Sequence, residues 1–134
     1  MKSIPPIQKF MTTEPKTINA DLTLADAHKI MSAEHIRHLP VLKGGRVVGL
    51  LSDRDVSLMM SIEGVDVESA TVESAMTEKP YTISPDALLD EVAVEMSENR
   101  YGSAVVVQNH HVVGIFTAVD GLRALSELLH TRMK

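Results

Sequence analysis

The feature that most constrains this chain is an internal repeat. When the 134-residue sequence is shifted by 65 positions, residues 11–56 align with residues 76–121 without a gap. Fourteen aligned positions carry the same residue, which is far more than unrelated segments share by chance. A repeat of this length indicates that one supersecondary unit occurs twice. The identities include Met11 with Met76, Thr12 with Thr77, Asp21 with Asp86, Gly49 with Gly114, and Asp55 with Asp120.

Both copies predict the same order of elements, namely strand, helix, strand, strand, helix. A short extended segment, 16–18 or 81–83, precedes a polar turn and a helix of about twelve residues with apolar residues at helical spacing. Two β-rich runs follow, at 38–43 and 46–51 in the first copy and at 103–108 and 111–116 in the second. Gly44-Gly45 is a strong hairpin turn and Asn109-His110 a weaker one. The second helix is expected to begin near Asp53 in one copy and near Ala118 in the other.

The repeat also predicts how the chain is divided. The first repeat, with a short N-terminal helix over Pro5–Phe10, occupies residues 1–61, and residues 62–70 form a linker. The second repeat occupies residues 71–134 and carries an amphipathic C-terminal helix over Leu122–Leu129. Because a unit of about 60 residues is only marginally stable alone, the two copies are expected to pack on each other.

Charge and composition exclude several classes of function. The formal net charge is −5 and aromatic residues make up 3% of the chain, which argues against nucleic-acid binding, because that depends on neutralising phosphates and stacking bases. The chain has no cysteine, so disulfides, thiolate catalysis and thiolate metal sites are excluded. No apolar run reaches the length of a signal-peptide core or a membrane span. We therefore expect a soluble cytoplasmic protein with neither a nucleic-acid nor a membrane partner.

One motif ends the last strand of each repeat: Gly, two large apolar residues, Ser or Thr, two variable residues and Asp. It spans residues 49–55 and 114–120. Taken alone, Ser or Thr followed three residues later by an acid is a capping box, which satisfies the amides of a helix start. The same helix start offers N–H groups to an anion, and an ionised Asp accepts hydrogen bonds from the hydroxyls of a ribose. Because the motif occurs twice at equivalent positions, we expect Asp55 and Asp120 to serve both as caps and as ribose ligands.

With these motifs, the chain from about residue 10 to residue 125 resembles the tandem pair of cystathionine β-synthase (CBS) domains known as a Bateman module. The marks are Met-Thr before each repeat, the run Arg37-His38-Leu39-Pro40-Val41, and both motifs ending in Asp. The resemblance implies an α+β fold of two tandem β-α-β-β-α repeats packed through their sheets about a pseudo-twofold axis. It also implies a cleft between the repeats for an adenosine-containing regulatory ligand, AMP first, with ADP, ATP or S-adenosylmethionine as alternatives, and no required cofactor.

The resemblance further assigns residues to two sites. Ser52 and Asp55 would hold a ribose in the first site, as Thr117 and Asp120 would in the second. Residues near the strand starts would line the adenine pockets, largely through backbone groups. They are Thr17, Ile18, His38, Leu39 and Pro40 in the first site, and Thr82, Ile83, Ser103 and Ala104 in the second.

Three arginines are the candidates for binding phosphate. Arg54 lies within the first motif, whereas Arg37 and Arg100 would face the cleft if the strands sit as the resemblance implies. The position equivalent to Arg54 is occupied by Val119, and that equivalent to Pro40 by Val105. The two sites are therefore expected to differ, with the Asp55 site preferring phosphorylated ligands.

The remaining signals do not predict catalysis or a metal site. His35 and His38, with His28 nearby, suggest a metal site, but no third ligand at a convincing spacing accompanies them. His110-His111 falls at a hairpin tip, where it is expected to be solvated. No Ser–His–Asp arrangement, Gly-rich phosphate loop or pair of catalytic carboxylates stands out, so we do not expect an enzyme.

The leading hypothesis is a regulatory module that responds to adenine nucleotides and signals to a separate, unidentified effector protein. The alternative is a structural dimerisation module whose cleft is empty or vestigial. In either case the amphipathic helices over Val56–Met60 and Leu122–Leu129 would expose a large apolar surface, so we expect a homodimer with twofold symmetry.

Overall fold

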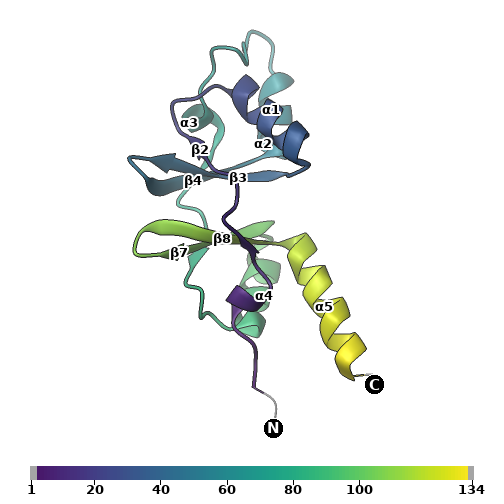
Figure 1. Ribbon diagram of the computed structural model, residues 1–134. Coiled ribbons are helices and arrows are strands. Elements are labelled where there is room, and N and C mark those ends of the chain that lie inside the picture. The colour runs from purple at the N-terminus through teal and green to yellow at the C-terminus, as the bar shows by residue number, and fades with distance from the viewer. Residues whose placement is uncertain (1–2, 133–134) are drawn as a thin grey trace. The chain divides into compact units, whose positions relative to one another are not determined.

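The computed structural model describes residues 3–132, and the chain divides into two compact units (Figure 1). One unit, called the Asp55 unit, runs from Lys16 to Pro80. The other, called the Asp120 unit, combines the N-terminal segment up to Pro15 with the chain from Tyr81 onward. Each unit has a four-stranded sheet and its own cluster of buried apolar residues. The predicted α+β class is confirmed.

The Asp55 unit is built on a sheet with the strand order β2-β3-β4-β5. Strands β3 and β4 form an antiparallel hairpin, β2 runs parallel to β3, and β5 adds antiparallel to the other edge of β4. Buried apolar residues of α1, α2 and α3 share one core cluster with those of the sheet. The elements are β2 (Ile18–Asn19), α1 (Leu24–Glu34), β3 (His38–Lys43), β4 (Arg46–Ser52), α2 (Asp53–Met60), α3 (Val72–Ala75) and β5 (Thr77–Glu78).

The Asp120 unit repeats this plan with the strand order β1-β8-β7-β6. Its hairpin is β7–β8, with β6 parallel to β7 and β1 antiparallel to β8. Within residues 3–132, no helix is both long and apolar enough to cross a membrane. The elements are the 3-10 turn η1 (Ile7–Lys9), β1 (Thr12–Thr13), β6 (Thr82–Ile83), α4 (Leu89–Asn99), β7 (Ser103–Gln108), β8 (His111–Thr117) and α5 (Ala118–Arg132).

The N-terminal segment does not fold with the repeat that follows it in the chain. On β1, Thr12 lies opposite Ile115 and Thr13 opposite Gly114, and Ile7 is fully buried in the core of the Asp120 unit. Strand β5, which precedes the second repeat, likewise pairs with β4 of the Asp55 unit. The compact units therefore differ from the chain-order division into residues 1–61 and 71–134, because each Met-Thr segment completes a sheet edge formed by the other repeat. Residues 1–2 and 133–134 of that division lie outside the described residues.

Residues 62–70, expected to be a linker, are part of the Asp55 unit. The carbonyl of Val67 accepts the amide of Ala25 at 3.0 Å, and the carbonyl of Ala70 accepts the amide of Leu24 at 2.9 Å. Val67 and Ala70 are also packed against the core of this unit. Because the first amides of a helix have no partner within the helix, this segment completes the start of α1.

The duplication extends to backbone conformations. Left-handed φ angles occur at Glu14 and Lys79 (47° and 51°) and at His35 and Arg100 (55° and 59°), each pair separated by the repeat spacing. The hairpin turns 44–45 and 109–110 follow the same rule. Side chains rarely adopt this region, apart from residues such as Asn. The weaker turn therefore keeps the geometry that the two glycines of the first turn adopt freely.

The glycine that opens each motif lies beneath a methionine. A Cβ atom on Gly49 would lie 2.4 Å from Sδ of Met76 and 2.9 Å from the backbone oxygen of Thr77. A Cβ atom on Gly114 would lie 2.4 Å from Sδ of Met11. Neither glycine has a positive φ, so the lack of space, rather than backbone conformation, requires glycine at these positions.

Candidate functional site

The motif of each repeat forms a helix start. Ser52 is the N-cap of α2: its Oγ accepts the amide of Asp55 at 3.1 Å, while Oδ2 of Asp55 accepts the amide of Ser52 at 2.9 Å. The same reciprocal bonds join Thr117 and Asp120 before α5, at 3.2 Å and 2.9 Å. Both capping boxes are therefore formed, and each holds its carboxylate beside the last residue of a strand.

Strand register brings further polar residues beside each capping box. His38 lies directly opposite Ser52 in the β3–β4 hairpin, and Ser103 lies opposite Thr117 in β7–β8. Residues directly opposite in an antiparallel pair have neighbouring side chains on one face of the sheet. We call His38, Ser52, Arg54 and Asp55 the Asp55 half-site, and Ser103, Thr117 and Asp120 the Asp120 half-site.

Backbone hydrogen bonds tie each helix start to the neighbouring strand. The amide of Asp53 donates to the carbonyl of Arg37 at 2.9 Å, and the amide of Ala118 donates to the carbonyl of Gly102 at 3.1 Å. These are equivalent bonds in the two repeats. They fix the first turn of α2 beside the start of β3, and the first turn of α5 beside the start of β7.

Several expected pocket residues turn their side chains into the hydrophobic cores. Ile18 and Leu39 belong to the core of the Asp55 unit, and Ala104 belongs to that of the Asp120 unit. Only the backbone groups of these residues are available to a ligand, which is the role that the resemblance implied. Of the others, Pro40 is buried, Ile83 is packed against the core, Thr17 is half-buried and Thr82 is exposed.

His38 has an altered proton affinity. Burial disfavours the charged ring and lowers the pKa of His38 below its ordinary value of 6.5, while the charges of Asp53 and Asp55 act in the opposite direction. The ring is therefore neutral at pH 7 and offers one donor and one acceptor. Its counterpart is Ser103, so the two half-sites present different polar groups.

The three candidate phosphate ligands lie in different surroundings. Arg54 is exposed on the first turn of α2, one residue before Asp55, and Arg37 is exposed directly before β3. Arg100 ends α4 as a left-handed C-cap residue and lines a groove between α4 and α5. None of the residues of the Asp120 half-site lines that groove. The Asp55 half-site therefore contains Arg54 and has Arg37 next to it, whereas Arg100 lies at the groove between α4 and α5.

Two residues beside Asp120 were missed by the sequence analysis. Oγ1 of Thr12 lies 3.4 Å from each carboxylate oxygen of Asp120, and Nη1 of Arg123 lies 3.3 Å from Oδ1. The spacing of Asp120 and Arg123 on one helix could have indicated their pairing. Thr12 is 108 positions away in the chain, so no local signal could have found it. In the same half-site, the buried Oγ of Ser103 has no hydrogen-bond partner in the described part of the chain.

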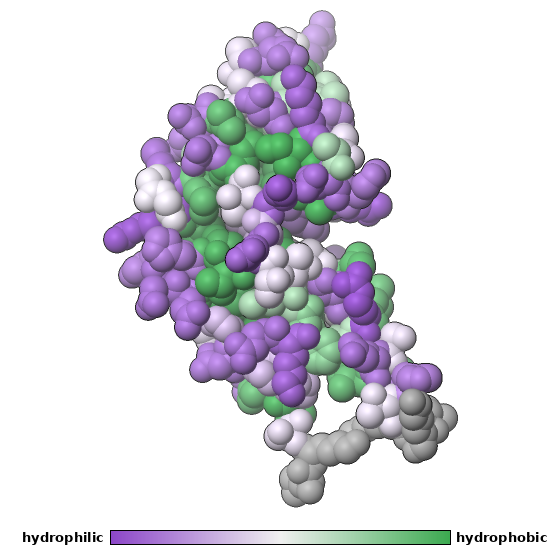
Figure 2. All heavy atoms as spheres, in the orientation of Figure 1, coloured by the Kyte–Doolittle hydropathy of each residue, from purple (hydrophilic) through white to green (hydrophobic). Residues whose placement is uncertain are grey.

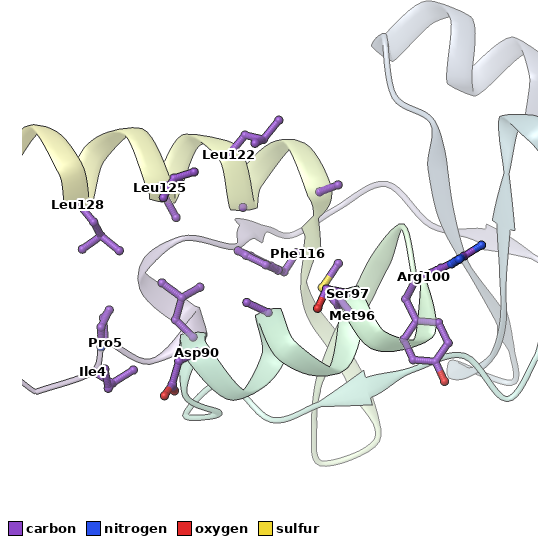
Figure 3. A pocket seen from close by; sticks show the side chains of 16 residues that line it. Ile4, Pro5, Asp90, Met96, Ser97, Arg100, Phe116, Leu122, Leu125 and Leu128 are labelled. Atoms are coloured by element: carbon purple, nitrogen blue, oxygen red, sulfur yellow. The ribbon is translucent and has the colours of Figure 1, made fainter.

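An apolar groove of about 730 Å³ lies between α4 and α5 in the Asp120 unit. Leu125 and Leu128 point from α5 toward α4 and the N-terminal segment, which contributes Ile4 and Pro5 to the lining (Figure 3). The Asp55 unit has a smaller pocket, of about 160 Å³, at α1 and α2. Across residues 3–132, no group of three or more His, Asp or Glu side chains is placed to hold a metal ion.

Comparison with known families identifies both repeats. The profile of the CBS domain matches residues 7–61 and again residues 72–127. Hypoxic response protein 1 of Mycobacterium tuberculosis is 30% identical over 125 residues, which cover 87% of each chain. These matches span most of the sequence, so the chain belongs to the CBS domain family.

Solved structures show the same fold. The CBS domain pair of protein MJ0100, in complex with 5′-methylthioadenosine and S-adenosyl-L-methionine, is 27% identical, has a TM-score of 0.85, and the alignment covers 93% of this chain and 98% of that one. Hypoxic Response Protein I, solved with two coordinated zinc ions, is 26% identical with a TM-score of 0.77, over 88% of this chain and 97% of that one. The predicted family and tandem CBS fold are therefore confirmed.

Proposed function

We propose that this CBS-domain chain is a regulatory module, without catalytic activity, that binds an adenosine-containing ligand at the Asp55 half-site and passes its occupancy to a partner protein. The observation that carries the proposal is the state of the Asp55 carboxylate. Its Oδ2 accepts the amide of Ser52, and among residues 3–132 no donor is bonded to its Oδ1. A ribose presents two neighbouring hydroxyl donors, which suit the free oxygen of a carboxylate held in one orientation.

The groups around Asp55 supply the other contacts that a nucleotide needs. The neutral ring of His38 lies opposite Ser52, and the exposed cation of Arg54 is available to a phosphate. Amides at the start of α2 favour a negative charge nearby. The ligands of the MJ0100 pair both contain adenosine, and this similarity favours the same ligand class for this chain. AMP is the first choice because Arg54 gives its phosphate a partner.

Calorimetric titration tests the proposal. The purified chain is titrated with AMP, ADP, ATP, NAD and S-adenosylmethionine under one set of conditions. Saturable heat with at least one adenosine compound supports the regulatory module. No heat with any compound of the panel would contradict it and would favour the alternative, a structural dimerisation module with a vestigial site.

Replacing Arg54 with alanine should weaken AMP binding by about tenfold to a hundredfold, because a charge-assisted hydrogen bond to phosphate contributes roughly 1.5–3 kcal/mol. Adenosine, which has no phosphate, should bind the variant nearly as well as the wild type. Both affinities are measured by calorimetry. Arg46→Ala, which removes an exposed arginine at the start of β4, is the matched control and should change neither affinity. Equal losses for AMP and adenosine would remove phosphate recognition from the role of Arg54.

We also propose that the chain forms a twofold homodimer through the face of α4 and α5. On α5, Leu122, Leu125 and Leu129 are 66%, 53% and 52% exposed. Figure 2 shows apolar and polar residues side by side along this helix, at the lower right. Exposed leucines beside a large apolar groove form the kind of contiguous patch that soluble monomers rarely leave uncovered. A second copy of the same face is the self-complementary partner that twofold symmetry provides.

Light scattering at micromolar concentration should give a mass of about twice the 14.7 kDa of one chain. Leu125→Glu should shift the mass to that of one chain, because it places a charge within the apolar contact. Val94→Glu is the matched control, since Val94 is 54% exposed on α4 and does not line the groove. A wild-type mass of one chain would contradict the homodimer.

A further inference from the structure

The two aspartates that define the half-sites have different surroundings. Asp55 is half-buried, and its carboxylate accepts one amide within the described chain. Asp120 is only 4% exposed, and donors from three parts of the Asp120 unit surround its carboxylate. The motif does not show this difference, because both aspartates follow the hydroxyl residue at the same spacing.

The donors around Asp120 leave little capacity for another hydrogen bond. Oδ2 accepts the amide of Thr117 at 2.9 Å and its hydroxyl at 3.1 Å. The hydroxyl of Thr12, on β1, lies within 3.4 Å of both oxygens, and Arg123 forms an ion pair with Oδ1 at 3.3 Å. An ionised carboxylate has about four lone-pair positions, so this one is close to saturated.

The Asp55 unit has no counterpart of the two outer donors. The position equivalent to Arg123 is Leu58, which cannot donate a hydrogen bond. The position equivalent to Thr12 is Thr77, and it pairs with Leu50 just as Thr12 pairs with the equivalent Ile115. Even so, within residues 3–132 the Thr77 hydroxyl makes no hydrogen bond to Asp55.

We infer that Thr12 and Arg123 are specificity-determining residues that keep the Asp120 half-site from taking a ribose. The chain then binds one adenosine-containing ligand, at Asp55. A ribose hydroxyl would have to displace Thr12 or Arg123 from a buried carboxylate that these donors already occupy. Asp120 instead has a structural role, because its hydrogen bond with Thr12 joins β1 to the start of α5. This inference rests on the proposed binding of adenosine at Asp55.

Calorimetry with AMP tests the inference through the number of molecules bound. The wild type should bind one AMP per chain. The double variant Thr12→Val/Arg123→Leu removes the Thr12 hydroxyl and replaces Arg123 with the residue found at the equivalent position, Leu58. It should bind two AMP per chain. The inference is overturned if the wild type binds two AMP and Asp120→Asn removes one of them. It is equally overturned if the folded double variant still binds one.

Melting curves without ligand test the hydrogen-bond network around Asp120, which is formed with Thr12, Thr117 and Arg123. Wild type, Thr12→Val, Asp120→Ala and the combined variant form a double-mutant cycle. The combined variant should lose less melting temperature than the sum of the single losses, because both changes remove the same hydrogen bond. Additive losses would overturn the inference whether or not AMP binds. If coupling is present but the wild type shows no heat with AMP, ADP, ATP, NAD or S-adenosylmethionine, the proposed function fails while the hydrogen bonds around Asp120 stand.

Discussion

Replacing Asp55 with alanine should remove most of the rise in melting temperature that AMP gives to the wild-type protein. At a ligand concentration about one hundred times the Kd, occupancy of one site adds about 2.7 kcal/mol to the free energy of unfolding. For a chain of this size that corresponds to roughly ten degrees. The loss of two charge-assisted hydrogen bonds to ribose would weaken binding by about 2–4 kcal/mol, which leaves little of the shift. The AMP-induced rise in melting temperature is measured from melting curves of both proteins with and without AMP.

The ligand-induced shift, rather than the melting temperature itself, is the quantity to compare. Asp55→Ala also removes a helix cap, which alone costs about 0.5–2 kcal/mol of stability. Asp120→Ala is the matched control, because it removes the equivalent cap and should keep the full AMP shift. An Asp55→Ala protein with a lowered melting temperature but an undiminished shift would show that Asp55 is a cap and nothing more.

Replacing Gly49 with alanine should destabilise the protein by about 1–3 kcal/mol, the usual cost of overpacking a filled site. The added Cβ atom would approach both Sδ of Met76 and the backbone oxygen of Thr77. The sulfur can move with its side chain, but the oxygen belongs to β5, which pairs with β4 at this position. The strand itself would therefore have to shift. Denaturant unfolding of the wild type and the variant measures the change.

Gly114→Ala provides the comparison. There the three nearest atoms, at 2.4 to 3.1 Å, all belong to the side chain of Met11. A flexible side chain can move aside, so Gly114→Ala should cost less than Gly49→Ala. Adding Met11→Ala should recover part of the stability lost in Gly114→Ala, whereas Met76→Ala should recover little in Gly49→Ala. Equal costs at the two glycines would contradict the role given to the Thr77 oxygen.

The hairpins and the principal helices could be predicted because their signals are local. The bounds of β3 and β7 agree with the sequence analysis, and α2 and α5 begin at Asp53 and Ala118 as expected. Strands β4 and β8 each extend one residue further than predicted, to Ser52 and Thr117. The reason is that the capping residue still pairs with the neighbouring strand while its side chain starts the helix.

Other elements could not be predicted because their stability comes from distant partners. Helix α3 has four residues, too few to form from intrinsic propensity, and is anchored by the fully buried Val72. Strands β1 and β5 have two residues each and depend on the edges of β8 and β4. The Pro5–Phe10 segment, expected as a short helix, forms only the 3-10 turn Ile7–Lys9.

The sequence by itself determined the duplication, the order of elements in each repeat, the capping motifs and the family. Each of these depends on residues that are close together in the chain or that recur at one spacing. Only the tertiary structure decided which sheet edge each Met-Thr segment joins, because sheet edges offer the same backbone donors and acceptors whichever repeat forms them. That choice brings Thr12 to Asp120. Thr77 takes the equivalent edge position in the Asp55 unit, but within residues 3–132 it makes no hydrogen bond to Asp55, and Leu58 stands where the other repeat has Arg123. Two aspartates that are equivalent in the motif therefore have different hydrogen-bond partners.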